Sequence, residues 1–130
     1  MANMPTTLML HEAAKIGDIK ALQELIAAGA NVNAHDKRGW TPLHEATVYD
    51  FKECVQLLLA AGANVNAGNN FDVTALHWAA VHGYAELVQL LIAAGAKVDA
   101  VTKTDETPLS LAASHNYTAV VEILKAAGAS

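Results

Sequence analysis

The sequence has little of what marks secreted, membrane and nucleic-acid-binding proteins. Its single cysteine, Cys54, leaves no internal disulfide to form and suits a reducing compartment. Eight Lys and Arg against thirteen Asp and Glu give a net charge of −5, which argues against a nucleic-acid partner. No apolar run approaches the roughly 20 residues that cross a membrane, and residues 1–7 lack the basic segment of a secretory signal. These absences predict a cytoplasmic or nuclear protein without a membrane or nucleic-acid partner.

Aromatic side chains are also scarce, at 5% of the chain, and only 16% of residues are charged. Yet 53% are hydrophobic, mostly Ala and Leu, which is too apolar for a disordered chain and enough for a buried core. A length of 130 residues fits one compact domain or one short repeat array. We therefore expect a single domain over residues 1–130.

Several motifs recur with a common period, so internal repeats organise this chain. His11, His44 and His77 are spaced by 33 residues, and the tripeptide Ala-Gly-Ala returns at 28–30, 61–63, 94–96 and 127–129 with the same step. Asn-Val-Asn-Ala ends the unit at 31–34 and 64–67. The shared period predicts four repeats, at about 3–35, 36–68, 69–101 and 102–130.

Each period predicts a helix, a turn, a second helix and a loop. Thr41 followed by Pro42 is typical of a helix start, and this first helix should run to about Val48. Asp50 and its equivalents Gly17, Gly83 and Asn116 are residue types that tolerate a left-handed backbone, so the first helix should end there. An apolar stripe that includes Phe51, Cys54 and Leu58 indicates the buried face of the second helix.

Two helices of this length cannot bury their own apolar face, so the repeats must stack on one another. The sequence thus predicts an all-α repeat fold, an α-solenoid with hairpin loops between its helix pairs. Thr41-Pro42-Leu43-His44-Glu45-Ala46 and its variants at 74–79 and 107–112 resemble the signature of the ankyrin repeat family. Asp72 and Asp105 depart from the family's usual loop glycine, which Gly39 keeps.

The end repeats carry polar residues where the middle repeats are apolar. Asp18, Glu24 and Lys125 replace aromatic or aliphatic residues of the other repeats, as capping repeats require. The alternative that this chain is part of a longer repeat array also stays open, because Leu111 and Ile123 remain apolar in the last repeat.

The resemblance implies a non-enzymatic protein that needs no cofactor. It assigns His11, His44 and His77 a structural role, in which the ring bonds the Thr hydroxyl and a neighbouring loop carbonyl. His35, His82 and His115 lack metal-ligand spacing, so we expect no metal site. Cys54 has Glu53 and Val55 beside it rather than basic residues, which indicates a core residue rather than a reactive thiol.

The resemblance further implies a partner protein bound on a concave face lined by the variable loop tips and first-helix ends. Aromatic side chains with a nearby Arg match the anatomy of binding hot spots, although Trp40 and Phe71 could instead pack between loops. The predicted partner-binding residues are Lys37, Arg38, Trp40, Val48, Tyr49, Asn70, Phe71, Val73, Val81, His82, Lys103, Glu106 and His115.

Two other hypotheses about the function of this chain stay open. The regular Ala-Ala-Gly-Ala endings suit an engineered or designed ankyrin scaffold or binder, whereas irregular segments such as 48–51 favour natural ancestry. Alternatively, the chain is the substrate-receptor or inhibitor part of a larger regulatory assembly. We expect the chain itself to be a monomer.

Asn33 and Asn66 are candidate modification sites. In ankyrin proteins an Asn at this place is similar to the target of an asparaginyl hydroxylase, and Asp99 replaces it in the third repeat. The simpler hypothesis is that the Asn side chain hydrogen-bonds the loop backbone.

Overall fold

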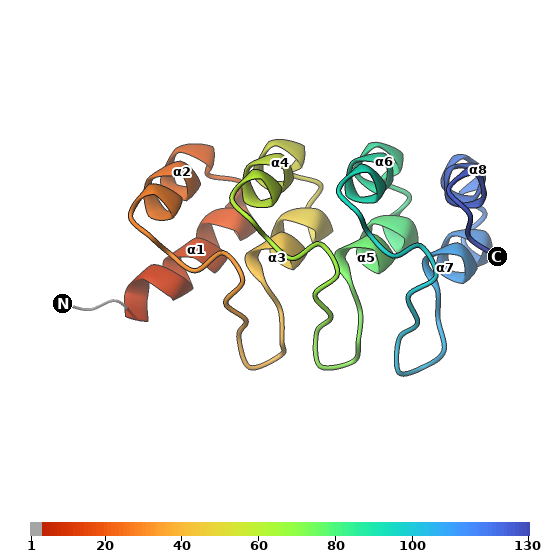
Figure 1. Cartoon of the computed structure of the whole chain (residues 1–130), viewed down its shortest axis with the longest axis horizontal. Coiled ribbons are helices and arrows are strands. Elements are labelled where there is room, and N and C mark those ends of the chain that lie inside the picture. The colour runs from red at the N-terminus through yellow and green to blue at the C-terminus, as the bar shows by residue number, and fades with distance from the viewer. Residues whose placement is uncertain (1–3) are drawn as a thin grey trace. The chain divides into compact units, whose positions relative to one another are not determined.

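The computed structural model describes residues 4–130, with side chains from Met9 onward, and these residues form helices and loops without a strand. Figure 1 shows the helices in pairs, with a long hairpin-shaped loop between each pair and the next. The elements are α1 (Met4–Ile16), α2 (Ile19–Ala27), α3 (Pro42–Val48), α4 (Lys52–Ala60), α5 (Ala75–His82), α6 (Ala85–Ala93), α7 (Pro108–Ser114) and α8 (Thr118–Ala126). The predicted all-α repeat fold is confirmed.

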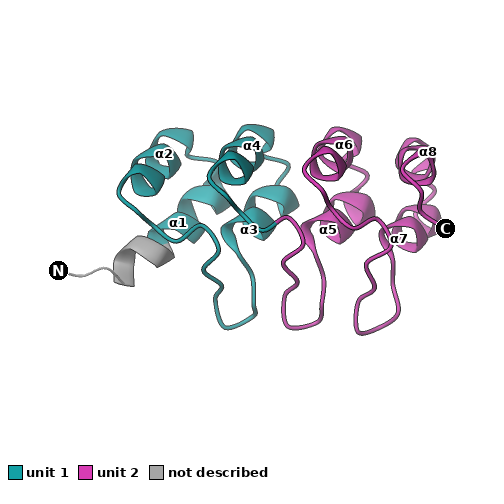
Figure 2. Ribbon diagram, in the orientation of Figure 1, with its two compact units in different colours: residues 1–64 teal, residues 65–130 magenta. Residues whose placement is uncertain are grey.

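The chain divides into two compact units, unit 1 over residues 1–64 and unit 2 over residues 65–130 (Figure 2). In unit 1 the first helices α1 and α3 pack against each other, and α2 packs on α4 in a second layer. In unit 2, α5 packs on α7 and α6 on α8 in the same way. Each unit therefore contains two stacked helix pairs, while the single domain over 1–130 stays a prediction.

The threonines at the helix starts form the predicted caps. Thr41 Oγ1 accepts a hydrogen bond from His44 N at 3.4 Å, and Thr41 N donates to His44 Nδ1 at 3.0 Å. Thr107 and Ser110 make the same reciprocal pair in the last repeat. These caps satisfy backbone N–H groups that a helix start leaves unpaired.

The turns between paired helices have the predicted left-handed backbone. Asp50 and Asn116 have φ of 58° and 60°, and Gly17 and Gly83 have 77° and 72°. Here the structure differs from the sequence prediction for the following aromatic residue. Phe51 lies at the N-cap of α4 rather than inside the helix, and its ring lies 3.0 Å from where a Cβ on Gly17 would sit.

The core of each unit consists of fully buried aliphatic side chains. Leu58 in unit 1 and Leu91 in unit 2 have no exposed surface. Cys54 is buried among them, and this burial, followed by the charges of Glu53 and Asp18, raises the pKa of its thiol. The prediction that Cys54 is a core residue is confirmed.

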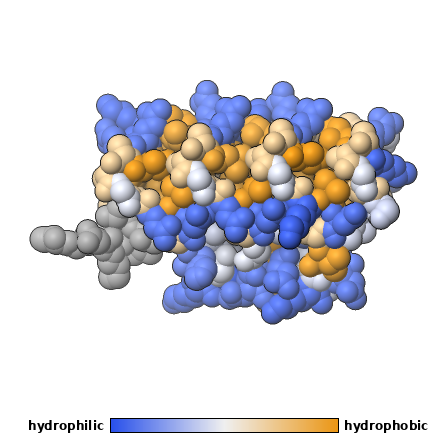
Figure 3. All heavy atoms as spheres, viewed as in Figure 1, coloured by the Kyte–Doolittle hydropathy of each residue, from blue (hydrophilic) through white to orange (hydrophobic). Residues whose placement is uncertain are grey.

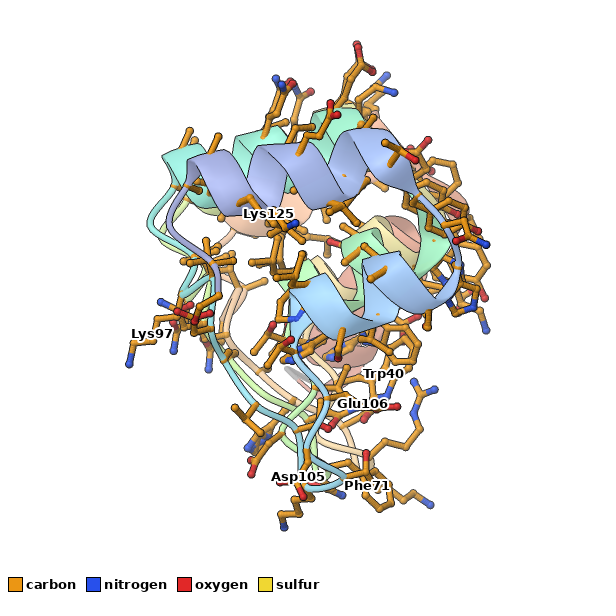
Figure 4. All side chains as sticks on the ribbon, turned by 90° about the vertical axis from the view of Figure 1, so that its right-hand side faces the viewer. Trp40, Phe71, Lys97, Asp105, Glu106 and Lys125 are labelled. Atoms are coloured by element: carbon orange, nitrogen blue, oxygen red, sulfur yellow. The ribbon has the colours of Figure 1, made fainter. Side chains whose placement is uncertain are left out.

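The polar residues of the end repeats are exposed, as the capping prediction requires. Asp18 also caps α2, because its carboxylate accepts a hydrogen bond from Ala21 N at 3.0 Å. Lys125 lies on the end face that α7 and α8 present to the viewer in Figure 4.

Candidate functional site

One side chain at the base of each hairpin loop fixes the loop's conformation. Asp36 Oδ1 accepts hydrogen bonds from the backbone N–H groups of Arg38 and Trp40 at 2.9 and 3.0 Å. Asn69 Oδ1 and Thr102 Oγ1 accept the two equivalent bonds in the next two hairpins. This column of residues was not predicted from the sequence, although its members are spaced by 33 residues and are of types that form turns.

In unit 1 the predicted residues Arg38 and Trp40 form a closed cluster. The Arg38 guanidinium carbon lies 4.3 Å from the centroid of the Trp40 ring, in a cation–π contact. Arg38 Nη2 also donates to Asp36 Oδ2 at 2.7 Å and to Glu45 Oε2 at 2.9 Å. These bonds raise the pKa of Arg38. For Asp36, desolvation by burial would raise the pKa, but the hydrogen bonds from Arg38 and Trp40 outweigh desolvation, so the pKa of Asp36 is lowered. Trp40 is therefore half-buried beneath a side chain of its own loop.

Tyr49 is the most exposed aromatic of unit 1, at 47%, and its ring stacks on Phe51 with centroids 6.2 Å apart. Lys37 is exposed at the hairpin, and Val48 is half-buried at the end of α3. Two exposed apolar residues of α1, Met9 and Ile16, were not predicted.

In unit 2 the hairpin carries Phe71, whose exposed fraction of 65% is the largest among the exposed large hydrophobic residues. Phe71 and Asp105 lie at the hairpin tips in Figure 4, and Glu106 lies closer to the helices. Phe71 O accepts a hydrogen bond from Lys103 N at 3.0 Å, which ties the two hairpins of this unit together. This bond joins backbone atoms only, and the exposed fraction of the Phe71 ring argues against the alternative that it packs between loops.

Unit 2 also contains a pocket of about 240 Å³ between its two repeats. Three predicted residues line it, namely Val73, Val81 and Glu106. Trp78 lines it as well and was not predicted, because its position in the repeat falls inside the expected first helix. The remaining lining residues are His77, Thr102 and Leu111.

Stacked rings continue from this pocket along the end of α5. Trp78 and His82 are nearly parallel, at an interplanar angle of 13°, and His82 lies 5.2 Å from the Tyr84 centroid. His115 stacks on Tyr117 in the next repeat at 5.6 Å. Both predicted histidines are exposed, so these stacks form surface rather than core.

The thirteen predicted partner-binding residues thus fall into separate groups on the two units. The structure brings Arg38 and Trp40 together in unit 1, and Val73, Val81 and Glu106 together in unit 2. The exposed members are Lys37, Arg38, Tyr49, Asn70, Phe71, His82, Lys103, Glu106 and His115, and the half-buried members are Trp40, Val48, Val73 and Val81.

The histidine column has the bonding that the resemblance implies. His77 Nδ1 lies 2.9 Å from Thr74 Oγ1, and Nε2 donates to Ala100 O at 3.0 Å and to Glu106 O at 3.1 Å. His11 Nε2 donates to Trp40 O at 2.9 Å in unit 1. Burial lowers the pKa of His77, although its carbonyl bonds act in the opposite direction.

The two asparagines at the loop ends bond the next loop of their own unit. Asn33 Oδ1 accepts from Asn64 N at 2.7 Å, and its Nδ2 donates to Gly62 O at 3.2 Å. Asn66 makes the equivalent bonds to Lys97 N and Gly95 O. The structural role of the amide is confirmed, and hydroxylation at Asn33 and Asn66 stays a prediction.

Hydrophobic surface in the view of Figure 3 lies mainly over the helices, whereas the hairpins are mainly hydrophilic on that face. Among the described residues there is no cluster of three His, Cys, Asp or Glu side chains that could hold a metal ion. Over the same part of the chain, every helix is too short or too polar to span a bilayer.

Stacked helix pairs, reciprocal Thr–His caps and loops fixed by side chains define a helical repeat protein. The family model for ankyrin repeats in three copies matches residues 10–102 and 68–130, so this chain belongs to the ankyrin repeat family. Ankyrin repeats are generally protein–protein interaction modules and typically non-enzymatic. No curated protein matches the chain.

Proposed function

We propose that this protein binds a partner protein through its hairpin tips and the adjoining ends of its first helices, the face that is concave in the family. It acts there as a monomer and without catalysis. The observation that carries the proposal is Phe71, a large apolar side chain that is 65% exposed on a fixed loop. A solvent-exposed aromatic anchor of this kind is typical of binding hot spots.

The fixed loop favours binding because little conformational entropy remains to be lost. Asn69 Oδ1 holds Phe71 N at 2.8 Å and Val73 N at 3.1 Å. Asp72 completes the turn with a left-handed φ of 61° and donates from its backbone to Asn69 O. The aromatic ring is therefore presented on a loop whose backbone is held by side-chain hydrogen bonds.

The test compares Phe71→Ser with Val101→Ser. Val101 is a suitable control because it is 50% exposed and apolar, but lies outside the predicted set. Each variant and the wild type would be immobilised, and retained proteins identified by mass spectrometry. A partner purified from this step would then be titrated by calorimetry.

We expect Phe71→Ser to weaken partner binding by about 2–4 kcal/mol and Val101→Ser to leave it unchanged. Both variants should keep the melting temperature of the wild type, since both side chains are exposed. A partner that binds Phe71→Ser as tightly as the wild type would contradict the proposal.

A further inference from the structure

Unit 1 contains an example of a cationic side chain, that of Arg38, held by other side chains of its own repeat. The Arg38 guanidinium carbon lies 4.3 Å from the Trp40 ring centroid, and Nη2 lies 2.9 Å from Glu45 Oε2. The face of one aromatic ring and two carboxylates, those of Asp36 at 2.7 Å and Glu45, thus hold the planar guanidinium within a single repeat. Arginine suits such a site because it stacks on rings and donates several hydrogen bonds in a fixed plane.

Unit 2 has an aromatic ring and a carboxylate at one pocket, but its own chain supplies no arginine there. Trp78 and Glu106 both line the pocket of about 240 Å³. The positions one and two periods after Arg38 are occupied by Phe71 and Thr104, so neither repeat of unit 2 has a cationic side chain at the place of Arg38. Among the residues with described side chains, no ion pair reaches Glu106.

We propose that this pocket binds an arginine side chain of the partner, with the guanidinium against Trp78 and Glu106. This inference rests on the proposed function and names the residue type that the unit 2 surface recognises. The methylene stem of the arginine would lie along the apolar walls formed by Val73, Val81 and Leu111.

The pocket has the size of a single side chain. Its volume of about 240 Å³ lies below the range of about 300–1,000 Å³ that is typical of drug-sized ligands and cofactors. A long, unbranched side chain with a charged end fits such a hollow better than a separate small molecule.

The acidic side of the pocket is held in place before any ligand arrives. Glu106 O accepts hydrogen bonds from His77 Nε2 and Thr102 N, at 3.1 and 3.0 Å, and Glu106 N donates to Thr102 Oγ1. Thr104 Oγ1 donates to Glu106 Oε1 at 3.0 Å and so orients the carboxylate. A fixed carboxylate of this kind reduces the ordering cost of binding a cation.

The net charge of unit 2 favours a cationic ligand as well. Residues 65–130 contain three lysines and six acidic residues, which gives 3 − 6 = −3. Lys103, on the same hairpin, is the nearest basic residue in sequence to Glu106. The surrounding field therefore attracts a basic segment, and the effect should weaken as salt is added.

Nuclear magnetic resonance titration of the ¹⁵N-labelled full chain tests the proposal. The probe is the acetylated and amidated pentapeptide Gly-Ser-Arg-Ser-Gly, compared with the same peptide carrying neutral citrulline or lysine instead of arginine. We expect the arginine peptide to shift the Trp78 indole and Glu106 amide signals. The citrulline peptide should shift neither, since it keeps the shape and loses the charge, and the lysine peptide should shift both less because an ammonium does not stack.

Two variants locate the charge that matters. Glu106→Gln keeps the side-chain shape and should lower the initial slope of the shifts about fivefold. Asp105→Asn is the matched control: it removes the adjacent charge at the hairpin tip, and Asn tolerates the left-handed φ of 64° at this position. This control should respond like the wild type.

Equal shifts with the citrulline peptide, an equal loss in Asp105→Asn, or no shift with any peptide would overturn the proposal. An equal response to the lysine peptide would overturn the choice of arginine. If partner binding depends on Phe71 but the arginine peptide does not bind the pocket, only this inference fails. If the pocket binds arginine but Phe71→Ser leaves partner binding intact, the proposed function fails instead.

Discussion

The two units share their skeleton and differ on their surfaces. In unit 1 the hairpin closes on itself, because Arg38 covers the Trp40 ring and pairs with the buried Glu45. In unit 2 the hairpin leaves Phe71 exposed, and a pocket opens beside Trp78 and Glu106. Helix caps, turn residues and buried leucines nevertheless follow the same spacing in both.

This difference shows which residue columns the fold requires and which it leaves to function. A column that caps a helix or fills the interface between repeats has the same neighbours each time, so the same residue type recurs. A column at the hairpin tip has solvent as its neighbour and can change freely. Our proposal of a binding surface is based on the variation of these columns in otherwise regular repeats.

The largest expected effect separates the cores of the two units. Leu58→Ala in unit 1 and Leu91→Ala in unit 2 each remove a fully buried side chain and should lower the free energy of unfolding by about 2–5 kcal/mol. Urea unfolding followed by fluorescence would use Trp40 to report on unit 1 and Trp78 on unit 2. If both tryptophans respond equally to either substitution, the two units unfold together; a loss below about 1 kcal/mol would contradict the interface role of these leucines.

A change of pH should act on unit 2 through His77. Because burial lowers the pKa of the folded ring, the unfolded chain binds a proton at higher pH than the folded chain does. The contribution of neutral His77 to stability is therefore complete above its ordinary pKa of 6.5 and is lost as the pH falls below that value. Urea unfolding at a series of pH values between 7.5 and about 5 measures the slope.

The control for this prediction is His77→Ala. It should lower stability by about 1–3 kcal/mol at neutral pH, because it leaves Thr74 N and two loop carbonyls without their bonds. It should also reduce the pH slope. An unchanged slope in this variant would assign the pH dependence to other groups.

Replacement of the turn glycine tests the packing of the aromatic column. In Gly83→Ala the new Cβ would lie 2.9 Å from Tyr117 Cδ1, on a backbone with φ of 72°. We expect a loss of about 1–2 kcal/mol from the left-handed backbone, with a further loss from the contact. The reverse change, Asn116→Gly at φ of 60°, should be neutral or slightly stabilising in thermal unfolding, and a marked loss there would contradict the backbone argument.

The smallest expected effect concerns the ion pairs of unit 1. Arg38→Thr introduces the residue type that the last repeat has at this position, Thr104. The cost should be about 0.2–1 kcal/mol, since Arg38 is 57% exposed at its side chain. Unfolding in low and high salt would show the difference from wild type shrinking with salt, and a salt-independent difference would indicate that lost packing on Trp40 dominates.

The repeat, its helices and its turns could be predicted from the sequence alone. The reason is that these features depend on neighbours a few residues apart. A threonine caps the N–H group three residues later, and a residue able to adopt positive φ ends the helix where it stands. Asp72 and Asp105, which departed from the loop glycine, still adopt φ of 61° and 64°.

By contrast, the folded chain was needed to show which variable side chains meet and which face solvent. Trp78 and Glu106 are 106 − 78 = 28 residues apart and come together because the helices of unit 2 stack. Arg38 and Trp40 are nearly adjacent in the sequence, yet nothing in it states that one covers the other. The burial and pairing of such residues depend on how repeats and loops pack against one another. A repeat pattern in the sequence identifies the positions that have the same neighbours in every repeat, but it does not show which residues meet at the positions that vary.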